Sequence, residues 1–536
     1  MKFITQTRQR MVKHYLLHLA MEVTPSHRAL SLKVLVVLTL SLSAQAAQVK
    51  KPHIIFLMVD DWGWANAGYH RNDSSKEVVT PNFDNLVREG LELDQHYVYK
   101  WCAPSRSSFL SGRLPIHVNV VNNTNEIAYN PKDPVSGFDG IPRNMTGIGT
   151  KMKEGGYATH MVGKWDAGMA TPDHTPLGRG FDSSLNYFHH ANDYYTEQAG
   201  VCNKTHIVDL WDTDKPASAL NGTGPDNYED GLFKERVLDI IRNHDPSTPL
   251  FLYYAPHIVH TPYQVPDRYL KKFNFIDQQY RQVYQAMVNY LDDAVGEIVA
   301  ALKNRGLWDN LLFVTSSDNG GPVHSAEVGG NNYPLKGGKI TDWQGGVRVN
   351  AFASGGYLPE SMRGQKTEGY IHVADWYATF SALAGVDPTD FQAGKASLPP
   401  IDSLNMWPLI SGQNSTAPRL DVPISNNTLI SGEYKILTGT LHGAGWTGPI
   451  YPNNTKTPGI INIIEQCGDG CLYNIKQDPE ERNNLASSMP NILKEMQTKL
   501  VKYQATVFEP DRGYTWPTAC ETALSTYGGF WGPFLP

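Results

Sequence analysis

Several features that mark specialised classes of protein are scarce or missing in this chain of 536 residues. It has only five cysteines, no block of five like charges and no internal repeat. These absences exclude a disulfide-dense small scaffold, a charged interaction tail and a solenoid. The formal net charge is −7, so nucleic acid is not an expected partner. Beyond residue 46 no apolar stretch is long enough to cross a bilayer, and we expect no membrane span after signal cleavage.

What is present is a globular composition, with 41% apolar and 18% charged residues, preceded by a targeting signal. The segment LKVLVVLTLSLSAQA, residues 32–46, has an apolar run that is too short for a bilayer and ends in small residues suited to cleavage. We therefore predict a signal peptide over residues 1–46, with an uncleaved anchor as the alternative. Eight N-x-S/T sequons agree with a glycoprotein of the secretory pathway, either extracellular or endolysosomal. These sequons begin at Asn72, Asn122, Asn144, Asn203, Asn221, Asn414, Asn426 and Asn453.

The cysteines are odd in number, which in an oxidising compartment leaves one without a partner. The stretch CGDGC predicts a local disulfide between Cys467 and Cys471. Cys202 and Cys520 are the remaining possible pair. Cys102 is then the unpaired residue, and three ordinary explanations stand open for it: half of a disulfide, a buried thiol and a catalytic thiolate.

Three apolar runs end directly in polar residues. Residues 54–59 lead into Asp60 and Asp61, the run from Leu250 leads into histidines, and NLLFVTSS leads into Asp318 and Asn319. Such runs predict buried strands of a parallel sheet, whose sites lie beyond the carboxyl ends of the strands. Adjacent buried carboxylates need a cation, and oxygen ligands favour Ca²⁺ or Mg²⁺.

Helical patterns separate these strands. Apolar residues recur every three to four positions from about residue 280 to 305, and a shorter helix follows Thr80, its expected cap, with Pro81 in the first turn. The alternation predicts a doubly wound α/β domain over 47–420. After about residue 420 short antiparallel strands and a helix near 491–503 predict a smaller C-terminal α+β subdomain over 421–536.

The stretch CAPSRSSFLSGR places Cys102, Pro104 and Arg106 in the spacing C-x-P-x-R. This stretch resembles the signature of the formylglycine-dependent type I sulfatases, in which the cysteine is oxidised to an aldehyde during secretion. The resemblance extends from about residue 51 to 536, through GYATHMVGKW, PLGRGFD, SSDNGG, NYPLKGGK, GGVR and DPEERNNL, and is greatest to the arylsulfatase B group, the N-acetylgalactosamine-4-sulfatases. It implies an alkaline-phosphatase-like sheet sandwiched by helices, and a sulfuric ester hydrolase that cleaves a sulfated sugar or polysaccharide. It also implies a formylglycine-generating enzyme as a partner during maturation.

The resemblance assigns roles residue by residue. Arg106 would hold the formylglycine hydroxyl, while Lys164 and Lys339 would bind sulfate oxygens. His260 would be the general acid at the leaving oxygen, with His257 as its rival. One Ca²⁺ ion per chain, or Mg²⁺, would be bound by Asp60, Asp61, Asp318, Asn319 and the modified Cys102.

One departure from the family pattern bears on activity. The family continues GKW with histidine, whereas this chain has Asp166. Asp166 can accept a proton, but it adds negative charge beside an anion, and His174 is our candidate to replace the missing imidazole. The departure keeps two alternatives open: a phosphodiesterase or phosphonate hydrolase of the same superfamily, and a catalytically weak, glycan-binding pseudo-sulfatase.

Overall fold

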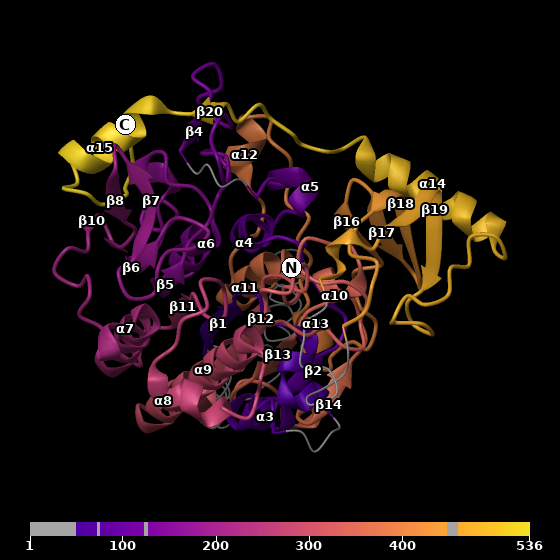
Figure 1. The fold of residues 1–536 in the computed structure, drawn as a ribbon, viewed down its shortest axis with the longest axis horizontal. Coiled ribbons are helices and arrows are strands. Elements are labelled where there is room, and N and C mark those ends of the chain that lie inside the picture. The colour runs from indigo at the N-terminus through magenta and orange to yellow at the C-terminus, as the bar shows by residue number, and fades with distance from the viewer. Residues whose placement is uncertain (1–49, 72–75, 123–126, 448–458) are drawn as a thin grey trace, which may run out of the picture. The chain divides into compact units, whose positions relative to one another are not determined.

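A central mixed sheet carries the long apolar runs of the sequence. The computed structural model describes residues 50–71, 76–122, 127–447 and 459–536; the predicted signal peptide and the sequons at Asn72 and Asn453 lie outside the described residues. Within the described ranges the sheet has ten strands (Figure 1). In spatial order these are β10 (Lys215–Pro216), β9 (Trp211–Asp212), β6 (Ser183–Tyr187), β5 (Ala158–Lys164), β11 (Leu250–Ala255), β1 (His53–Val59), β12 (Leu311–Ser317), β13 (Ala351–Ser354), β2 (Leu91–Leu93) and β14 (Gln365–Thr367).

The middle of this sheet is parallel, and the predicted strands form it. β6, β5, β11, β1 and β12 pair in parallel, while β9, β10 and β13 run antiparallel to their neighbours towards the edges. All seven residues of β1 and all six of β11 are buried, as expected for a strand covered on both faces. The carboxyl ends of β1, β5, β11 and β12 therefore meet at one edge of the sheet.

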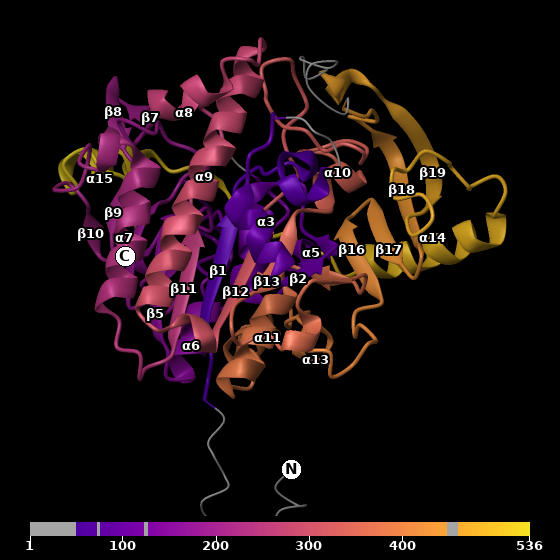
Figure 2. The ribbon, with the colours of Figure 1, turned by 90° about the horizontal axis from the view of Figure 1, so that it is seen from below.

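Helices cover both faces of the sheet, and the alternation of side chains along β1 shows how. Ile55 and Leu57 pack with α3, α7 and α9, which lie in front of the sheet in Figure 2. Ile54 and Phe56 point to the opposite face and pack with α4, α6 and α11. The bounds of these helices are α3 (Pro81–Arg88), α4 (Cys102–Ser111), α6 (Ile148–Glu154), α7 (Glu229–Asn243), α9 (Gln279–Asn304) and α11 (Asp375–Ala384). This sandwich confirms the predicted doubly wound α/β class.

Shorter helices and strands complete the large unit, by which we mean the ten-stranded sheet and the segments packed around it. The remaining α-helices of this part are α5 (Pro115–Val118), α8 (Asp267–Leu270), α10 (Gln344–Val347), α12 (Phe391–Lys395) and α13 (Trp407–Ile410). The 3₁₀ helices are η1 (Trp64–Asn66), η2 (Gly68–His70), η3 (Pro172–His174), η4 (Pro225–Asn227), η5 (Lys271–Phe273), η6 (Trp308–Asn310), η7 (Glu360–Met362) and η8 (Ile460–Asn462). Three two-stranded sheets join β3 (His96–Tyr97) to β15 (Ile371–His372), β4 (Ala128–Tyr129) to β20 (Tyr514–Thr515), and β7 (Gln198–Cys202) to β8 (Thr205–Val208).

The residue before α3 differs from the expectation in detail. Thr80 occupies the N-cap position of α3, but its side chain makes no capping hydrogen bond to the helix. Its hydroxyl donates to Asp84 Oδ1 and accepts from the amide of Gly68 instead. The hydroxyl therefore ties η2 to α3 rather than satisfying a free helix amide.

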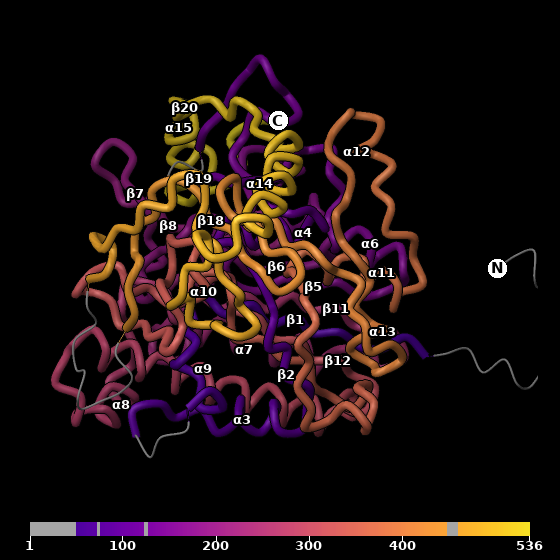
Figure 3. Tube along the Cα trace, turned by 90° about the vertical axis from the view of Figure 1, so that its right-hand side faces the viewer, coloured from indigo at the N-terminus to yellow at the C-terminus, as the bar shows by residue number. Residues whose placement is uncertain are grey.

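A second, antiparallel sheet of four strands confirms the predicted C-terminal subdomain. It consists of β16 (Asp421–Ser425), β17 (Thr428–Ser431), β18 (Tyr434–Leu441) and β19 (Glu465–Asn474). α14 (Pro490–Gln504) packs on β17, β18 and β19, and Figure 3 shows it passing beside β18 and β19. Leu429, Ile436 and Leu472 meet Met496 and Leu500 in this interface.

The last thirty or so residues leave this sheet and return to the large unit, so the boundaries of the two predicted parts, 47–420 and 421–536, stay predictions. β20 pairs with β4, and α15 (Pro517–Ser525) lies beside β7 and β8, far from α14 in Figure 1. Trp531 lies on the same side, and its amide donates a hydrogen bond to the carbonyl oxygen of Val208. A disulfide between Cys202 and Cys520, which the cysteine count leaves as the remaining possible pair, fastens this return.

Candidate active site

The acidic residues after β1 and β12 lie together, as their positions in the sequence predicted. Asp60 and Asp61 follow β1, and Asp318 and Asn319 follow β12, its parallel neighbour. The amide of Asp61 donates to Asp318 Oδ1 at 3.1 Å, and Asn319 Nδ2 donates to Asp61 Oδ1 at 2.7 Å. All four side chains are buried. Burial and the charge of Asp60 raise the pKa of Asp318, against the opposing effect of Arg106.

Cys102 begins α4 and faces this acidic group. Its Sγ lies 3.5 Å from Asp60 Oδ1 and 3.4 Å from Asn319 Oδ1. It is buried, and it is the one cysteine of the chain without a disulfide. Burial raises the pKa of the Cys102 thiol, and the nearby carboxylates of Asp318 and Asp60 raise it further. This environment therefore disfavours the ordinary thiolate among the three explanations open for Cys102.

Three cations from separate segments of the chain, namely α4, β5 and a turn, neutralise the carboxylates. Arg106, one turn into α4, donates to Asp318 Oδ2 from Nε at 3.1 Å and from Nη2 at 2.8 Å. Lys164, the last residue of β5, places Nζ 2.7 Å from Asp60 Oδ2. Lys339 Nζ lies 2.7 Å from Asp61 Oδ1.

The two lysines remain charged in spite of their burial. Burial lowers the pKa of Lys164 and of Lys339, but Asp60 and Asp61 respectively outweigh it and raise both. Both ammonium groups are therefore held in place for an anion that enters this edge of the sheet.

The two rival histidines after β11 face different partners. His260 Nδ1 lies 2.7 Å from the carbonyl oxygen of Thr261, which can only accept, so Nδ1 carries the proton. His260 Nε2 lies 3.7 Å from Asp61 Oδ2 and so faces the site. His257 instead places Nδ1 3.0 Å from Glu229 Oε2. The geometry supports His260 over His257, although its catalytic role stays a prediction.

Asp166 and His174 do not meet. Asp166 Oδ2 lies 3.7 Å from Lys164 Nζ, at the edge of the cluster. His174 lies in η3, where its Nδ1 is 2.9 Å from Thr171 Oγ1 and its ring packs against Phe138. Within the described part of the chain no hydrogen bond or ion pair joins His174 to the cluster around Cys102.

The imidazole that contacts Asp166 belongs to a residue that our sequence reading did not select. His190 Nδ1 lies 2.8 Å from Asp166 Oδ1. His190 follows β6, and β6 pairs with β5, which carries Lys164 at its end. Strand adjacency would have brought the two segments together, but nothing in the sequence distinguishes His190 from His189 as the partner of Asp166.

The donor atoms at the strand ends suit a hard divalent cation. Ligand atoms of Asp60, Asp61, Cys102 and His260 lie within 4.8 Å of one another, and the side-chain oxygen of Asn319 lies beside Cys102. Carboxylate and amide oxygens are the ligands preferred by Ca²⁺ and Mg²⁺. The residues present therefore fit the predicted metal.

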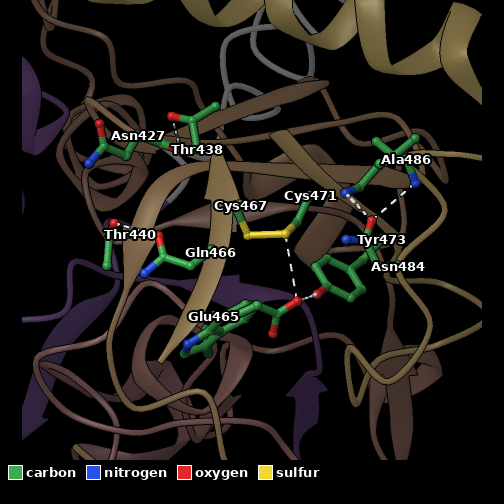
Figure 4. Close-up of a disulfide and its surroundings, with 12 residues drawn as sticks. Asn427, Thr438, Thr440, Glu465, Gln466, Cys467, Cys471, Tyr473, Asn484 and Ala486 are labelled. Carbon is green, nitrogen blue, oxygen red and sulfur yellow. Dashed lines mark hydrogen bonds between the residues drawn. A yellow bond between two sulfur atoms is a disulfide. The ribbon is translucent and has the colours of Figure 1, made fainter. Parts of the chain in front are cut away.

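A second group with ligand-like residues, on β19, is not a comparable site. Cys467 and Cys471 form the predicted local disulfide, so their sulfurs cannot bind a metal as thiolates. Figure 4 shows this bridge with Glu465 below it. Glu465 Oε1 lies 3.6 Å from Cys471 Sγ and accepts a hydrogen bond of 2.6 Å from the Tyr473 hydroxyl.

Comparison with known proteins places the chain in a family. The family model described as Sulfatase matches residues 52–386, more than half of the chain, so the chain belongs to the sulfatase family. It is 33% identical to arylsulfatase J of Mus musculus over 92% of this chain and 81% of that protein. It is 32% identical to N-acetylgalactosamine-6-sulfatase of Rattus norvegicus over 76% of this chain and 75% of that protein.

A solved structure supports the same assignment. The crystal structure of Ps i-CgsB matches with a TM-score of 0.70 and 26% identity over 88% of this chain and 97% of that one. The same protein in complex with k-i-k-neocarrahexaose matches with a TM-score of 0.68 and 25% identity, over 89% and 98% of the two chains. Family and fold together confirm the predicted sulfuric ester hydrolase.

Proposed function

We propose that this chain removes sulfate from a sulfated sugar or polysaccharide, using formylglycine made from Cys102 and one divalent cation, Ca²⁺ or Mg²⁺. The observation that carries the proposal is the position of Cys102: its Sγ lies within 3.5 Å of Asp60 and Asn319, at the strand ends where Lys164 and Lys339 also converge. A residue at that position faces both the metal ligands and the cations that suit a sulfate.

The metal would be held by Asp60, Asp61, Asp318, Asn319 and the modified residue 102. When bound, such a cation supplies a Lewis acid that offsets the negative charge of the sulfate ester and favours loss of a proton from a hydroxyl group. Arg106 keeps Asp318 in place through its two hydrogen bonds. The carboxylates and the guanidinium thus keep the nucleophilic position fixed against the cation site.

The modification explains why a cysteine with a disfavoured thiolate stands at this position. As an aldehyde hydrate, formylglycine supplies two hydroxyl groups on one carbon, one for attack at sulfur and one through which sulfate is afterwards released. A serine or cysteine has only one such group and would be left as a stable ester. The C-x-P-x-R stretch from Cys102 to Arg106 supports a formylglycine-generating enzyme as a partner in maturation.

The lysines and His260 would serve the anion and the leaving group. Lys164 and Lys339 bind sulfate oxygens, which keeps the ester oriented and offsets its charge. Burial lowers the pKa of His260, and the charges of Lys339 and Lys164 lower it further. Because the entering sulfate brings negative charge beside the ring, it favours the protonated form of His260, which then protonates the leaving alcohol oxygen.

The substrate class and compartment rest on different observations. The relatives include an N-acetylgalactosamine-6-sulfatase and a protein crystallised with k-i-k-neocarrahexaose, which supports a sulfated sugar rather than a small aryl ester as the natural substrate. Two disulfides and exposed sequons at Asn203 and Asn414 support an extracellular or endolysosomal protein. No helix in the described ranges combines the length and the apolar character that a bilayer crossing needs.

Mass spectrometry of the secreted protein tests the proposal directly. We expect the peptide that contains residue 102 to be roughly 18 Da lighter than the encoded peptide, a change that the oxidation series of a thiol does not produce. The same preparation should release sulfate from p-nitrophenyl sulfate much faster than it cleaves bis-p-nitrophenyl phosphate.

The other outcomes separate the alternatives. Faster cleavage of the phosphodiester would assign the chain to the phosphodiesterase or phosphonate hydrolase alternative. A modified residue 102 with glycan binding but no release of sulfate would identify a pseudo-sulfatase. An unmodified thiol together with an intact sulfate ester would contradict the proposal.

A further inference from the structure

The segment after β6 brings a second imidazole to the edge of the site. His190 and Asp166 form a contact of 2.8 Å, and their side chains are only 13% and 2% exposed. Burial raises the pKa of Asp166, but the charges of His190, Lys164 and Arg106 outweigh it and lower the pKa to about 2. The carboxylate is therefore ionised near neutral pH and can only accept, so the Nδ1 of His190 is the donor.

The second oxygen of Asp166 faces Lys164. Asp166 Oδ2 is buried, has no hydrogen-bond partner within the described ranges, and lies 3.7 Å from Lys164 Nζ. Lys164 Nζ is also 2.7 Å from Asp60. The ammonium group thus lies between two carboxylates, and one of them, Asp166, stands where it would attract Lys164 away from a bound sulfate and repel the sulfate itself.

We propose that His190 is a positioning residue: as an imidazolium it is the counter-ion of Asp166, and it thereby leaves Lys164 available for the sulfate group. The inference rests on the proposed function, because it takes sulfate as the anion that Lys164 binds. The pairing also explains how an acidic residue can stand at position 166, because the carboxylate and the imidazolium together carry no net charge.

The neighbouring histidine provides a matched control. His189 is also 13% exposed and also pairs with a buried carboxylate, at 2.7 Å from Asp209. Asp209, however, accepts from the amides of Phe188 and His189, and none of the ion pairs of the described residues joins it to Lys164. Removal of His189 therefore tests the loss of a similar side chain from the same segment without a change in the charge near Lys164.

A double-mutant cycle tests the inference on the metal-loaded, modified enzyme. Binding of inorganic sulfate is measured by calorimetry, and kcat and KM are measured with a sulfate ester, for His190→Ala, Asp166→Asn, the double variant and His189→Ala. We expect His190→Ala to weaken sulfate binding about 10- to 100-fold and to raise KM more than it lowers kcat. The double variant should return to within about threefold of the wild type, because it lacks the carboxylate that needs neutralising. His189→Ala should leave sulfate binding unchanged.

The pH dependence gives an independent readout. Imidazolium groups lose their proton between about pH 5 and 8, so the KM of the wild type should rise across this range. The charged groups of the described residues that face Asp166 besides His190 are Lys164 and Arg106, and both keep their charge over it. The KM of Asp166→Asn should lack this rise.

Each remaining outcome decides the question. If the double variant binds sulfate as weakly as His190→Ala, His190 acts on the substrate directly and the inference is wrong; unchanged binding in His190→Ala also overturns it. His190→Gln, which keeps a donor without the charge, replaces His190→Ala if that variant does not fold. If the wild type binds sulfate normally but does not cleave the ester, the proposed function is wrong. The role of His190 as the counter-ion of Asp166 is then still decided by the calorimetric binding of sulfate to the same variants.

Discussion

Two buried groups of charges in this molecule are built on opposite plans. At the start of α11 a single carboxylate, Asp375, meets a single cation, Arg419, whose Nε donates to it at 2.6 Å and whose Nη2 donates to its other oxygen. The amides of His372 and Leu404 donate to the same carboxylate at 2.8 and 2.9 Å. Its acceptor sites are thus satisfied by the chain itself.

At the strand ends the carboxylates are crowded instead. Asp60, Asp61 and the thiol of Cys102 have ligand atoms within 4.8 Å of one another, and Asp318 accepts from the amide of Asp61. The cations Lys164 and Lys339 contact Asp60 and Asp61. A buried charge is therefore not in itself a sign of function. A carboxylate whose acceptor sites are all filled by hydrogen bonds from the chain belongs to a structural ion pair. Several like charges whose oxygens converge indicate a binding site for a ligand.

The largest effect should come from Cys102→Ala, which removes the side chain in the middle of the crowded group. We expect kcat to fall by at least about 10⁴-fold, because both hydroxyls of the proposed formylglycine are lost. The measurement is release of sulfate, with circular dichroism and the thermal midpoint as controls for folding. Residual turnover within tenfold of the wild type would show that the nucleophile lies elsewhere.

Removal of the ion pair between Asp375 and Arg419 should have the opposite effect: the stability falls while the catalytic activity of the folded protein is kept. Arg419→Met leaves the carboxylate of Asp375 buried without its cation, which costs about 3–5 kcal/mol of the free energy of unfolding. The native fraction should retain the kcat of the wild type. The double variant Arg419→Met/Asp375→Asn should recover part of the loss, and a fall in kcat would contradict the separation of the two groups.

Removing a single cation from the site should have an intermediate effect on catalysis. Lys339→Gln deletes one charge that faces the sulfate, and we expect kcat/KM to fall about 10²- to 10³-fold. It also leaves Asp61 without its partner at 2.7 Å, so added Ca²⁺ should restore the thermal midpoint more than the activity. Full recovery of activity with Ca²⁺ would show that Lys339 only balances charge.

The crowded group was largely predictable from the sequence, because polar residues directly after apolar runs must emerge at one edge of a parallel sheet. Asp60, Asp61, Asp318 and Asn319 are brought together for that reason, and Cys102 was marked by its local motif. These signals are local or depend only on strand order.

Other features depend on contacts between segments that no periodicity marks. His190 pairs with Asp166 across 24 positions, and the two-residue strands β4 and β20 come from opposite halves of the chain. Neither one histidine of an adjacent pair in a loop nor a strand of two residues leaves a pattern in the sequence. Nearness in the chain therefore points from Asp166 to His174, while the structure brings His190 to Asp166.

The smallest effect concerns a buried carboxylate that is held by amide groups. Glu197 Oε2 accepts from Asn221 Nδ2, and burial raises the pKa of Glu197 to about 7 despite this hydrogen bond. The carboxyl of Glu197 therefore keeps its proton to a higher pH in the native state than in the unfolded chain. The stability that this difference contributes is lost as the pH rises from about 4.5 to about 7. We expect Glu197→Gln to remove a pH-dependent change on the order of 1 kcal/mol. Unfolding curves at pH 5 and 8 should differ less for the variant than for the wild type, and equal differences would refute the assignment.

The complete burial of α4 limits when the proposed modification of Cys102 could take place. Every residue from Cys102 to Ser111 is buried in the folded protein. An enzyme that reads this stretch must therefore reach it on the nascent chain, before the hydrophobic side of the helix closes onto the sheet. Under the proposed function, a molecule that folds with its thiol intact would have to unfold before it could be modified, so the modified fraction of a population would be set when the chains fold and would persist for the lifetime of each copy.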